Sequence, residues 1–222
     1  MTVSASAVRS VLVTGGTVRL GKAIADRLRA DGWRVLVTSH RPDAGADIVA
    51  DFATPSGAVN AYAAAMRLLN GKPPDALVNN AALFSDEEPE LRAVNLTAPV
   101  KLTMLMAGRE TPTRGAVVNI LDARVLGDRP ADGAYAQTKR ALLDETKKAA
   151  ALFAESLRVN AVAPGPVFAP TAVHEKAGET LLGRPTAADV AAAVAYLLDA
   201  TSTTGVVLPV DGGQHLLLAA ES

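Results

Sequence analysis

The segment from Thr14 to Gly21 constrains the fold most strongly, because a glycine-rich turn there joins two recognisable elements. The apolar run Val8–Val13 precedes it and predicts a buried strand, and the residues from Lys22 to Ala30 form an amphipathic helical pattern. A strand, a glycine turn and a helix start form a cradle for a diphosphate, since backbone N–H groups point at the phosphates. The alternative is an ordinary turn between a strand and a helix, without a ligand.

The cations around this cradle favour NADP(H) over NAD(H). In the open pattern T-G-x-x-x-G-x-G, the second glycine is replaced by Arg19, and a cation beside a diphosphate cradle indicates an extra phosphate. NAD enzymes usually carry an acidic residue near the end of the second strand, whereas this chain has Ser39, His40 and Arg41 there. These three could also be ordinary polar loop residues. Asp51, which ends the third predicted strand, could accept from the adenine amino group or could cap a turn.

Composition excludes several other classes of function. The 222 residues suffice for one α/β domain, and 49% apolar residues allow a sizeable core. The net charge of −1 argues against nucleic acid as the main partner. The absence of cysteine excludes disulfides and thiolate metal sites, and the three histidines are far apart, so we expect no metal. No apolar run approaches the length of a membrane span and no signal-peptide core is evident, so we expect a cytoplasmic protein without a membrane partner.

Short apolar runs alternate with helical patterns along the chain. The predicted strands are Val8–Thr14, Arg34–Thr38, Asp47–Ala50, Ala76–Asn79, Ala116–Leu121, Leu157–Ala163 and Gly205–Val210. The predicted helices are 20–31, 56–70, 88–108, 132–154 and 187–199, the last preceded by the capping-box pattern Thr186-x-x-Asp189. This alternation predicts an α/β fold, a doubly wound Rossmann-like parallel sheet in a single domain over residues 1–222, with ligands at the carboxyl ends of the strands.

A second group of residues points to proton transfer. Tyr135 and Lys139 are four residues apart in a predicted helix and therefore share a face. A neighbouring ammonium favours the phenolate and is expected to lower the pKa of Tyr135. Asp122 ends the preceding strand, thirteen residues before Tyr135. Asn95 lies inside a predicted helix, where asparagine is unfavourable; it could hold a water or a backbone carbonyl, or face solvent.

Together these motifs resemble the short-chain dehydrogenases/reductases over essentially the whole chain. The matching pieces are Thr14–Gly21, Asn79-Asn80-Ala81-Ala82, Val94-Asn95-Leu96, Tyr135-x-x-x-Lys139, Arg158–Pro166 and Asp211-Gly212-Gly213. The resemblance implies NAD(P)-dependent hydride transfer at a carbonyl or imine, with Tyr135 as proton donor, Lys139 as its pKa partner and Asn95 in a proton relay. Besides the residues above, the expected cofactor-binding residues are Gly15, Leu20, Gly21, Phe52, Asn79, Ala81, Pro164, Gly165 and Val167.

One departure from the family pattern narrows the substrate. The usual catalytic serine is Asp122 here, and an ionised carboxylate cannot donate to a developing alkoxide. A carboxyl can, however, pair with ring N–H groups or pass a proton to a ring nitrogen. The combination of Arg19, His40-Arg41 and Asp122 resembles the pteridine reductases and dihydromonapterin reductases. Phe84 stands where pteridine reductases carry the aromatic that stacks on the pterin; otherwise it is a loop aromatic that covers the core.

We therefore expect an NADPH-dependent reductase of a dihydropterin or related pteridine, with Phe84, Asp122 and Tyr135 binding the substrate. The alternatives are a ketone or quinone reductase of the same fold and a non-catalytic NADP-binding regulator, against which the intact Tyr135–Lys139 pair argues. The short connections Arg41–Ala46 and Phe168–Arg184 predict an open pocket. The resemblance also implies a homotetramer, with the apolar tail from His215 to Ala220 at an interface or packed on its own subunit.

Overall fold

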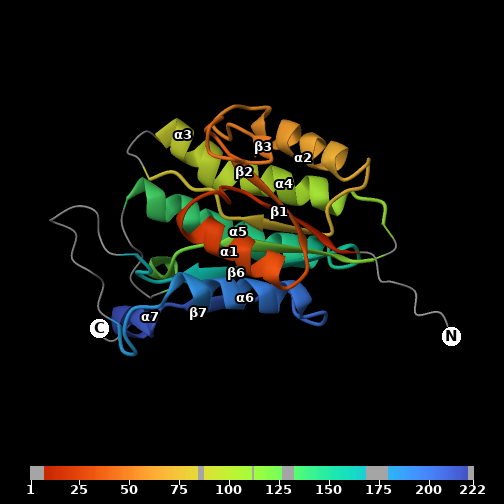
Figure 1. The fold of residues 1–222 in the computed structure, drawn as a ribbon. Coiled ribbons are helices and arrows are strands. Elements are labelled where there is room, and N and C mark those ends of the chain that lie inside the picture. Colours follow the sequence, from red (N-terminus) through yellow and green to blue (C-terminus); the bar gives the residue numbers. More distant parts are fainter. Residues whose placement is uncertain (1–7, 85–87, 112, 127–132, 169–179, 220–222) are drawn as a thin grey trace.

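The computed structural model describes residues 8–84, 88–111, 113–126, 133–168 and 180–219. Most of the predicted substrate loop from Phe168 to Arg184, and Ala220 at the end of the tail, lie outside these residues. The described elements form a central sheet with helices on both of its faces (Figure 1).

The sheet confirms the doubly wound fold. Among the described residues it has seven parallel strands in the order β3-β2-β1-β4-β5-β6-β7. Their bounds are β1 Ser10–Val13, β2 Arg34–Ser39, β3 Ile48–Val49, β4 Ala76–Asn79, β5 Gly115–Ile120, β6 Leu157–Pro164 and β7 Val207–Val210. Val13 pairs with Val37 on one side and with Val78 on the other. The strand order therefore reverses at β1, and the carboxyl ends of β1 and β4 flank the crevice where such sheets bind ligands.

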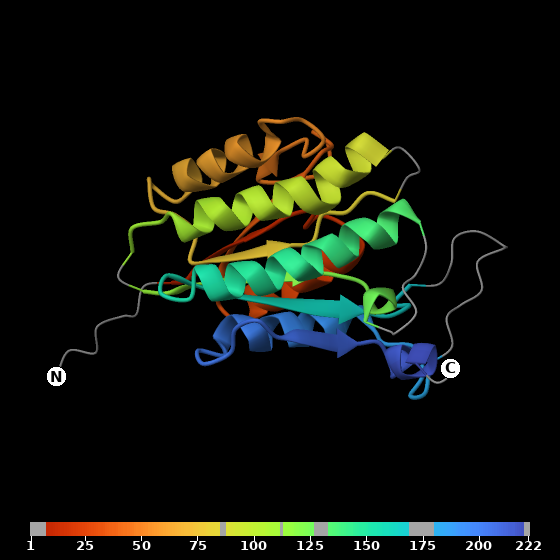
Figure 2. The ribbon, with the colours of Figure 1, turned by 180° about the vertical axis from the view of Figure 1, so that it is seen from behind.

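Two layers of helices cover the sheet. One face carries α1 (Arg19–Ala30) and α6 (Ala187–Asp199), and the other carries α2 (Gly57–Leu68), α4 (Ala98–Ala107) and α5 (Ala134–Leu152). Figure 2 shows these last three side by side, in orange, yellow-green and green, over the sheet. Within the described ranges, no helix has both the length and the apolar character that crossing a bilayer requires.

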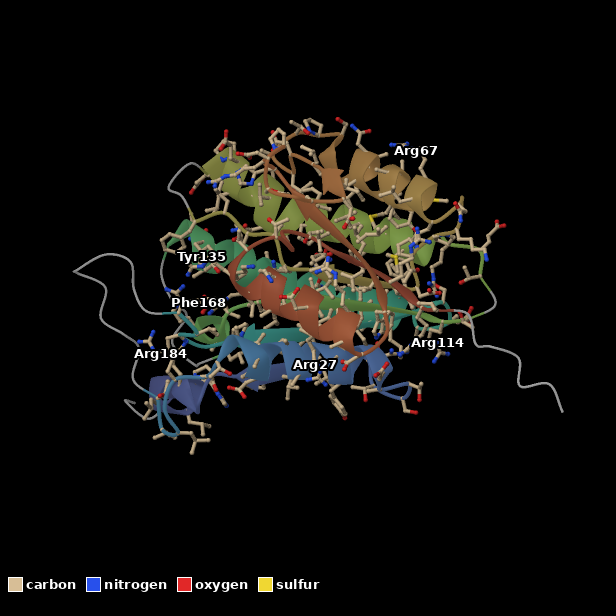
Figure 3. The ribbon with its side chains drawn as sticks, in the orientation of Figure 1. Arg27, Arg67, Arg114, Tyr135, Phe168 and Arg184 are labelled. Carbon is tan, nitrogen blue, oxygen red and sulfur yellow. The ribbon has the colours of Figure 1, made fainter. Side chains whose placement is uncertain are left out.

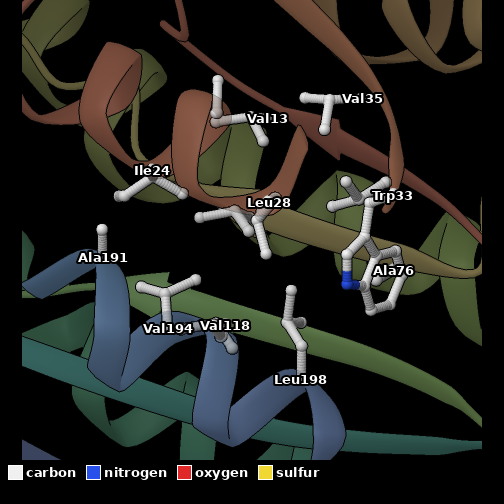
Figure 4. Packing of buried hydrophobic residues seen from close by; sticks show 14 of the residues in the cluster. Val13, Ile24, Leu28, Trp33, Val35, Ala76, Val118, Ala191, Val194 and Leu198 are labelled. Atoms are coloured by element: carbon white, nitrogen blue, oxygen red, sulfur yellow. The ribbon is translucent and has the colours of Figure 1, made fainter. Parts of the chain in front are cut away.

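The core follows from the alternation of side chains along the strands. Val11 and Val13 face the layer of α1 and α6, whereas Leu12 between them joins the cluster under α2 and α4. Helix α1 buries Gly21, Ile24, Ala25 and Leu28, the spacing of one helical face. In Figure 4, Ile24 and Leu28 meet Ala191, Val194 and Leu198 of α6 above the strands. This packing fixes the helix start that follows the glycine turn.

The structure differs from the predicted elements at three places. The predicted helix 88–108 is α3 (Glu88–Arg92), a π-helical turn η1 (Ala93–Thr97) and α4 in direct succession. The third strand has two residues, and the other described boundaries agree with the prediction or move by one or two residues. A short helix α7 (Gln214–Ala219) was not predicted, because its six residues carry too little periodicity. The capping box is confirmed: the Asp189 N–H donates to Thr186 Oγ1 (3.2 Å) and the Thr186 N–H donates to Asp189 Oδ2 (2.8 Å).

Candidate active site

A cleft of about 1110 Å³ lies at the carboxyl ends of the strands. It runs from the glycine turn and the residues after β2 to the start of α5 and the residues after β6. In Figure 3, Tyr135 and Phe168 lie at this end of the molecule and Arg114 at the opposite end. Most of the predicted site residues line it, namely Gly15, Arg19, Leu20, Gly21, Ser39, His40, Arg41, Asp51, Phe52, Ala81, Phe84, Asp122, Tyr135, Lys139, Pro164, Gly165 and Val167. The described residues hold no cluster of three or more His, Asp or Glu side chains that could bind a metal ion.

The glycine turn has the shape of a diphosphate cradle. Gly15 has a φ of +62°, and a Cβ at Gly21 would collide with the Gly15 carbonyl oxygen. The Thr14 hydroxyl accepts from the backbone N–H groups of Asn80 (2.9 Å) and Ala81 (3.0 Å). Asn80 Nδ2 in turn donates to the carbonyl oxygens of Thr14 (2.9 Å) and Gly15 (3.1 Å). The turn is thus tied to the end of β4, and its residues fit the diphosphate of a dinucleotide.

Arg19 points along the cleft in a direction that the sequence did not predict. Its φ of +48° is in the left-handed region, which explains why related patterns place glycine there. Its guanidinium carbon lies 4.5 Å from the ring centroid of Phe168, which follows β6. In the sheet β6 and β2 lie on opposite sides of β1, so Arg19 extends away from the end of β2.

The other end of the cleft carries the cations predicted for a 2′-phosphate. His40 and Arg41 are exposed after β2, and Ser39 Oγ accepts from the Arg41 N–H (3.0 Å). Asp51 lines the cleft and also caps its own turn, because its Oδ1 accepts from the Ala53 N–H (2.9 Å). Phe52 lines the same end while packing into the core.

The side chain of Asn79, which the resemblance assigned to the cofactor, does not line the cleft. Asn79 is buried, and its Nδ2 donates to Asn119 Oδ1 (2.8 Å), while Asn119 Nδ2 donates to Thr146 Oγ1 (2.9 Å) on α5. This network lies beneath α4 and α5, away from the cleft. Because successive side chains of a strand point to opposite faces, the neighbouring Asn80 has the position that was predicted for Asn79.

Lys139 is buried at the floor of the cleft. Its Nζ donates to the Ile120 carbonyl oxygen (2.8 Å), and 2% of the residue is exposed. Burial lowers the pKa of Lys139 to about 8, although the negative charge of Asp122 acts to raise it. The distance from Lys139 Nζ to the Tyr135 ring centroid is 5.8 Å.

The expected lowering of the Tyr135 pKa is not observed. Burial raises the pKa of Tyr135 well above its usual value, the charge of Asp122 raises it further and that of Arg124 partly opposes. The Lys139 ammonium donates to the Ile120 carbonyl oxygen, and its Nζ lies 5.8 Å from the centroid of the Tyr135 ring. In the protein without ligand, Tyr135 is therefore a phenol that keeps its proton.

The side chain of Asn95 holds a backbone group, and its part in the proton relay that the resemblance implies stays a prediction. Its Oδ1 accepts from the Leu83 N–H (2.8 Å) and its Nδ2 donates to the Leu83 carbonyl oxygen (2.9 Å). The π-helical turn η1 presents this fully buried amide to the chain segment before Phe84. Of the three roles left open, Asn95 has that of holding a backbone group, and it positions the wall of the cleft.

The centre contains an ion pair that sequence reasoning missed. Asp122 Oδ1 accepts from Arg124 Nε (3.0 Å) and Oδ2 accepts from Arg124 Nη2 (2.9 Å). The Arg124 guanidinium carbon is 5.6 Å from the Tyr135 ring centroid. The Phe84 ring is tilted against the Tyr135 ring, with 4.9 Å between the centroids, and 70% of Phe84 is exposed. The only signal in the sequence was an arginine two residues after Asp122.

Comparisons with known proteins identify the family of this chain. The family model described as short chain dehydrogenase matches residues 9–180. A protein of Streptomyces violaceoruber with the name "Granaticin polyketide synthase putative ketoacyl reductase 2" is 34% identical, over 93% of this chain and 96% of that protein.

Two solved structures are similar to this chain over more than nine tenths of its length. FolM alternative dihydrofolate reductase 1 from Brucella canis, complexed with NADP, has a TM-score of 0.83 at 29% identity and covers 94% of each chain. A metagenomic blue fluorescent protein in complex with NADPH has a TM-score of 0.81 at 29% identity, over 93% of this chain and 97% of that chain. These complexes bear out the predicted cofactor, NADPH/NADP+. The fold, the glycine cradle, the Tyr135–Lys139 pair and the family match together place this chain in the short-chain dehydrogenase/reductase family.

Proposed function

We propose that this protein is an NADPH-dependent reductase of a dihydropterin or related pteridine. The observation that carries the proposal is the carboxylate of Asp122 in the cleft beside Tyr135, at the position where the family resemblance leads us to expect a serine. The similarity to a protein named alternative dihydrofolate reductase supports it. NADPH, when bound, supplies the hydride that reduces a ring C=N bond.

Cations at two places in the cleft are proposed to bind different phosphates of the cofactor. We assign the 2′-phosphate of NADPH to His40 and Arg41, because both are exposed at the end of β2. Arg19 belongs to the diphosphate, because its side chain extends toward the β6 side of the cradle. Asp51 is left to accept from the adenine amino group while it caps its turn.

The catalytic end pairs an acid with a flat apolar surface. Tyr135 keeps its proton at neutral pH because its pKa is raised, so it can act as the proton donor. Asp122 can accept from ring N–H groups or pass a proton to a ring nitrogen, which a serine hydroxyl does less well. The exposed ring of Phe84 offers a stacking surface for a heterocycle beside both groups.

A carbonyl reductase is the second candidate, and the ketoacyl reductase among the relatives favours it. For a ketone, hydride transfer creates an alkoxide, and the charge of Asp122 would oppose it. A non-catalytic NADP-binding regulator is the third candidate. It would have no use for the buried Lys139 beside Tyr135, because burying that amine destabilises the fold.

The test is NADPH oxidation with dihydropterins, dihydrofolate, quinones and small ketones, for the wild type and for Asp122→Ser. We expect Asp122→Ser to lower kcat/KM for the best dihydropterin by about a hundredfold and to spare or raise ketone turnover. Asp122→Asn should also impair pterin reduction, and Tyr135→Phe should abolish all activity. Asp144→Ser, an exposed change on α5, is the matched control. A wild type that reduces ketones far better than any pterin would refute the pteridine assignment.

We further propose a cytoplasmic homotetramer. Between α4 and α5 a hollow of about 260 Å³ is lined mostly by apolar residues, among them Met104 and Leu152, together with the polar residues Thr103 and Asn119 and the charged residues Glu145 and Lys148. Met104 is 59% exposed and Leu152 is 76% exposed. Leu216 of α7 is 55% exposed, so the tail offers a second apolar surface. Light scattering at micromolar concentration should give four subunits, and Leu152→Glu should reduce that number. A monomeric wild type would contradict the proposal.

A further inference from the structure

Arg124 forms a two-pronged contact with Asp122 inside the cleft. The two bonds run from Nε to Oδ1 (3.0 Å) and from Nη2 to Oδ2 (2.9 Å), a geometry that fixes the plane of the carboxylate. The side chain of Asp122 is 18% exposed and that of Arg124 is 46% exposed. Both residues line the cleft with Tyr135 and Lys139.

The backbone does not need this side chain. Asp122 also caps the short 3-10 helix η2 (Ala123–Val125), because its Oδ1 accepts from the Arg124 N–H (2.9 Å). Any residue except proline at position 124 provides that N–H. The cap therefore explains Asp122 as a loop residue, and it does not use the guanidinium of Arg124.

The electrostatics of the centre give the guanidinium of Arg124 a role. The carboxylate of Asp122 stands beside Tyr135, where the hydride and the proton must meet, and hydride transfer makes the substrate more negative. An uncompensated carboxylate there opposes the reaction. The guanidinium carbon of Arg124 is 5.6 Å from the Tyr135 ring centroid, and its charge acts on the Tyr135 hydroxyl in the opposite sense to that of Asp122.

We propose that Arg124 is a positioning residue of the reductase centre, which fixes the orientation of the Asp122 carboxylate and offsets its charge beside Tyr135. It allows an acid to stand where the family resemblance predicts a hydroxyl. The inference rests on the proposed reductase function, with Tyr135 as proton donor, but it holds for a C=N and for a C=O substrate alike. It makes position 124 a partner of position 122 in setting which substrates are reduced.

The test uses Arg124→Gln, Arg124→Lys, Asp122→Asn and the double variant Asp122→Asn/Arg124→Gln, with Arg67→Gln as a matched control. Arg67 is exposed on α2, and it is not part of the cleft lining. Rates are measured with the dihydropterin and the carbonyl compound that the wild type reduces fastest. Thermal unfolding is followed in parallel, and we expect each midpoint to stay within about 4 °C of the wild type.

Arg124→Gln should lower kcat about tenfold to a hundredfold with either substrate, with KM changed much less. Arg124→Lys keeps the positive charge but cannot form the two parallel hydrogen bonds to the carboxylate, so its kcat should lie between those of Arg124→Gln and the wild type. With the carbonyl compound, the double variant should be faster than Arg124→Gln, because Asp122→Asn removes the charge that Arg124 offsets. If Arg124 only stabilised the loop, adding Asp122→Asn to Arg124→Gln would not raise the rate.

The outcomes separate the two proposals. If the wild type reduces carbonyl compounds but no pterin, the pteridine assignment fails while the Arg124 series still tests the ion pair. If Arg124→Gln has a kcat within about twofold of the wild type, or the double variant is no faster than Arg124→Gln, the role of Arg124 is overturned and the reductase assignment stands. A wild type that oxidises NADPH with none of the compounds overturns both.

Discussion

Replacing Lys139 with methionine should stabilise the folded protein. Lys139 is 2% exposed, and its Nζ donates to one backbone carbonyl, that of Ile120. Folding therefore takes an amine out of water with little compensation, and burial lowers its pKa from the ordinary 10.5 to about 8. Methionine is apolar, has a similar length, and avoids the cost of removing a charge from water.

The pKa shift gives the size of the effect and its dependence on pH. A fall from 10.5 to about 8 corresponds to about 3 kcal/mol at neutral pH, at about 1.4 kcal/mol per pKa unit. The folded pKa is the lower one, so between pH 8 and 10.5 the unfolded chain binds a proton that the folded chain does not, and wild-type stability rises with pH there. Losing the bond to the Ile120 carbonyl costs about 1 kcal/mol at every pH. We expect Lys139→Met to be about 2 kcal/mol more stable at pH 7.

The measurement is urea unfolding of the wild type and Lys139→Met at pH 7 and pH 10. The advantage of the variant should fall by about 2 to 3 kcal/mol between these two pH values. Lys147→Met, an exposed change two turns further along α5, is the matched control. A constant difference for Lys139→Met, or one that grows toward pH 10, would refute the assignment of a buried amine with a lowered pKa.

Three further predictions concern the two ends of the cleft. Arg41→Ala should lower the preference for NADPH over NADH at least tenfold, because a charge-assisted contact contributes about 1.5–3 kcal/mol; the ratio of the two kcat/KM values measures it, and an unchanged ratio contradicts the 2′-phosphate assignment. Phe168→Leu should raise the Kd for NADPH about twofold to fivefold; fluorescence titration should find no further loss when it is added to Arg19→Ala, whereas additive losses would show that Phe168 does not act through Arg19. Asn95→Ala should lower stability by about 2 kcal/mol and also lower kcat, because the two bonds to Leu83 are lost; a fully active and stable variant would argue against the positioning role.

The sequence alone was sufficient for the fold and for the chemical type of the site. Buried parallel strands are continuous apolar runs, and the turn from Thr14 to Gly21 needs glycine for local steric reasons, so both are visible without neighbours. The doubly wound parallel fold class followed from the alternation of strands and helices, and the order of the strands comes from the structure. The Tyr135–Lys139 pair was visible because four residues make about one helical turn.

Tertiary structure decided where the side chains point and how their charges behave. Asn79 and Asn80 are adjacent in sequence, yet only the packing of β4 against α4 shows which of them reaches the cleft. The direction of Arg19 depends on Phe168, which is brought to it from beyond β6. The raised pKa of Tyr135 and the lowered pKa of Lys139 come mainly from burial, and Asp122 meets both groups because β5 ends next to α5. Directions and desolvation are set by residues distant in the chain, so no local pattern encodes them.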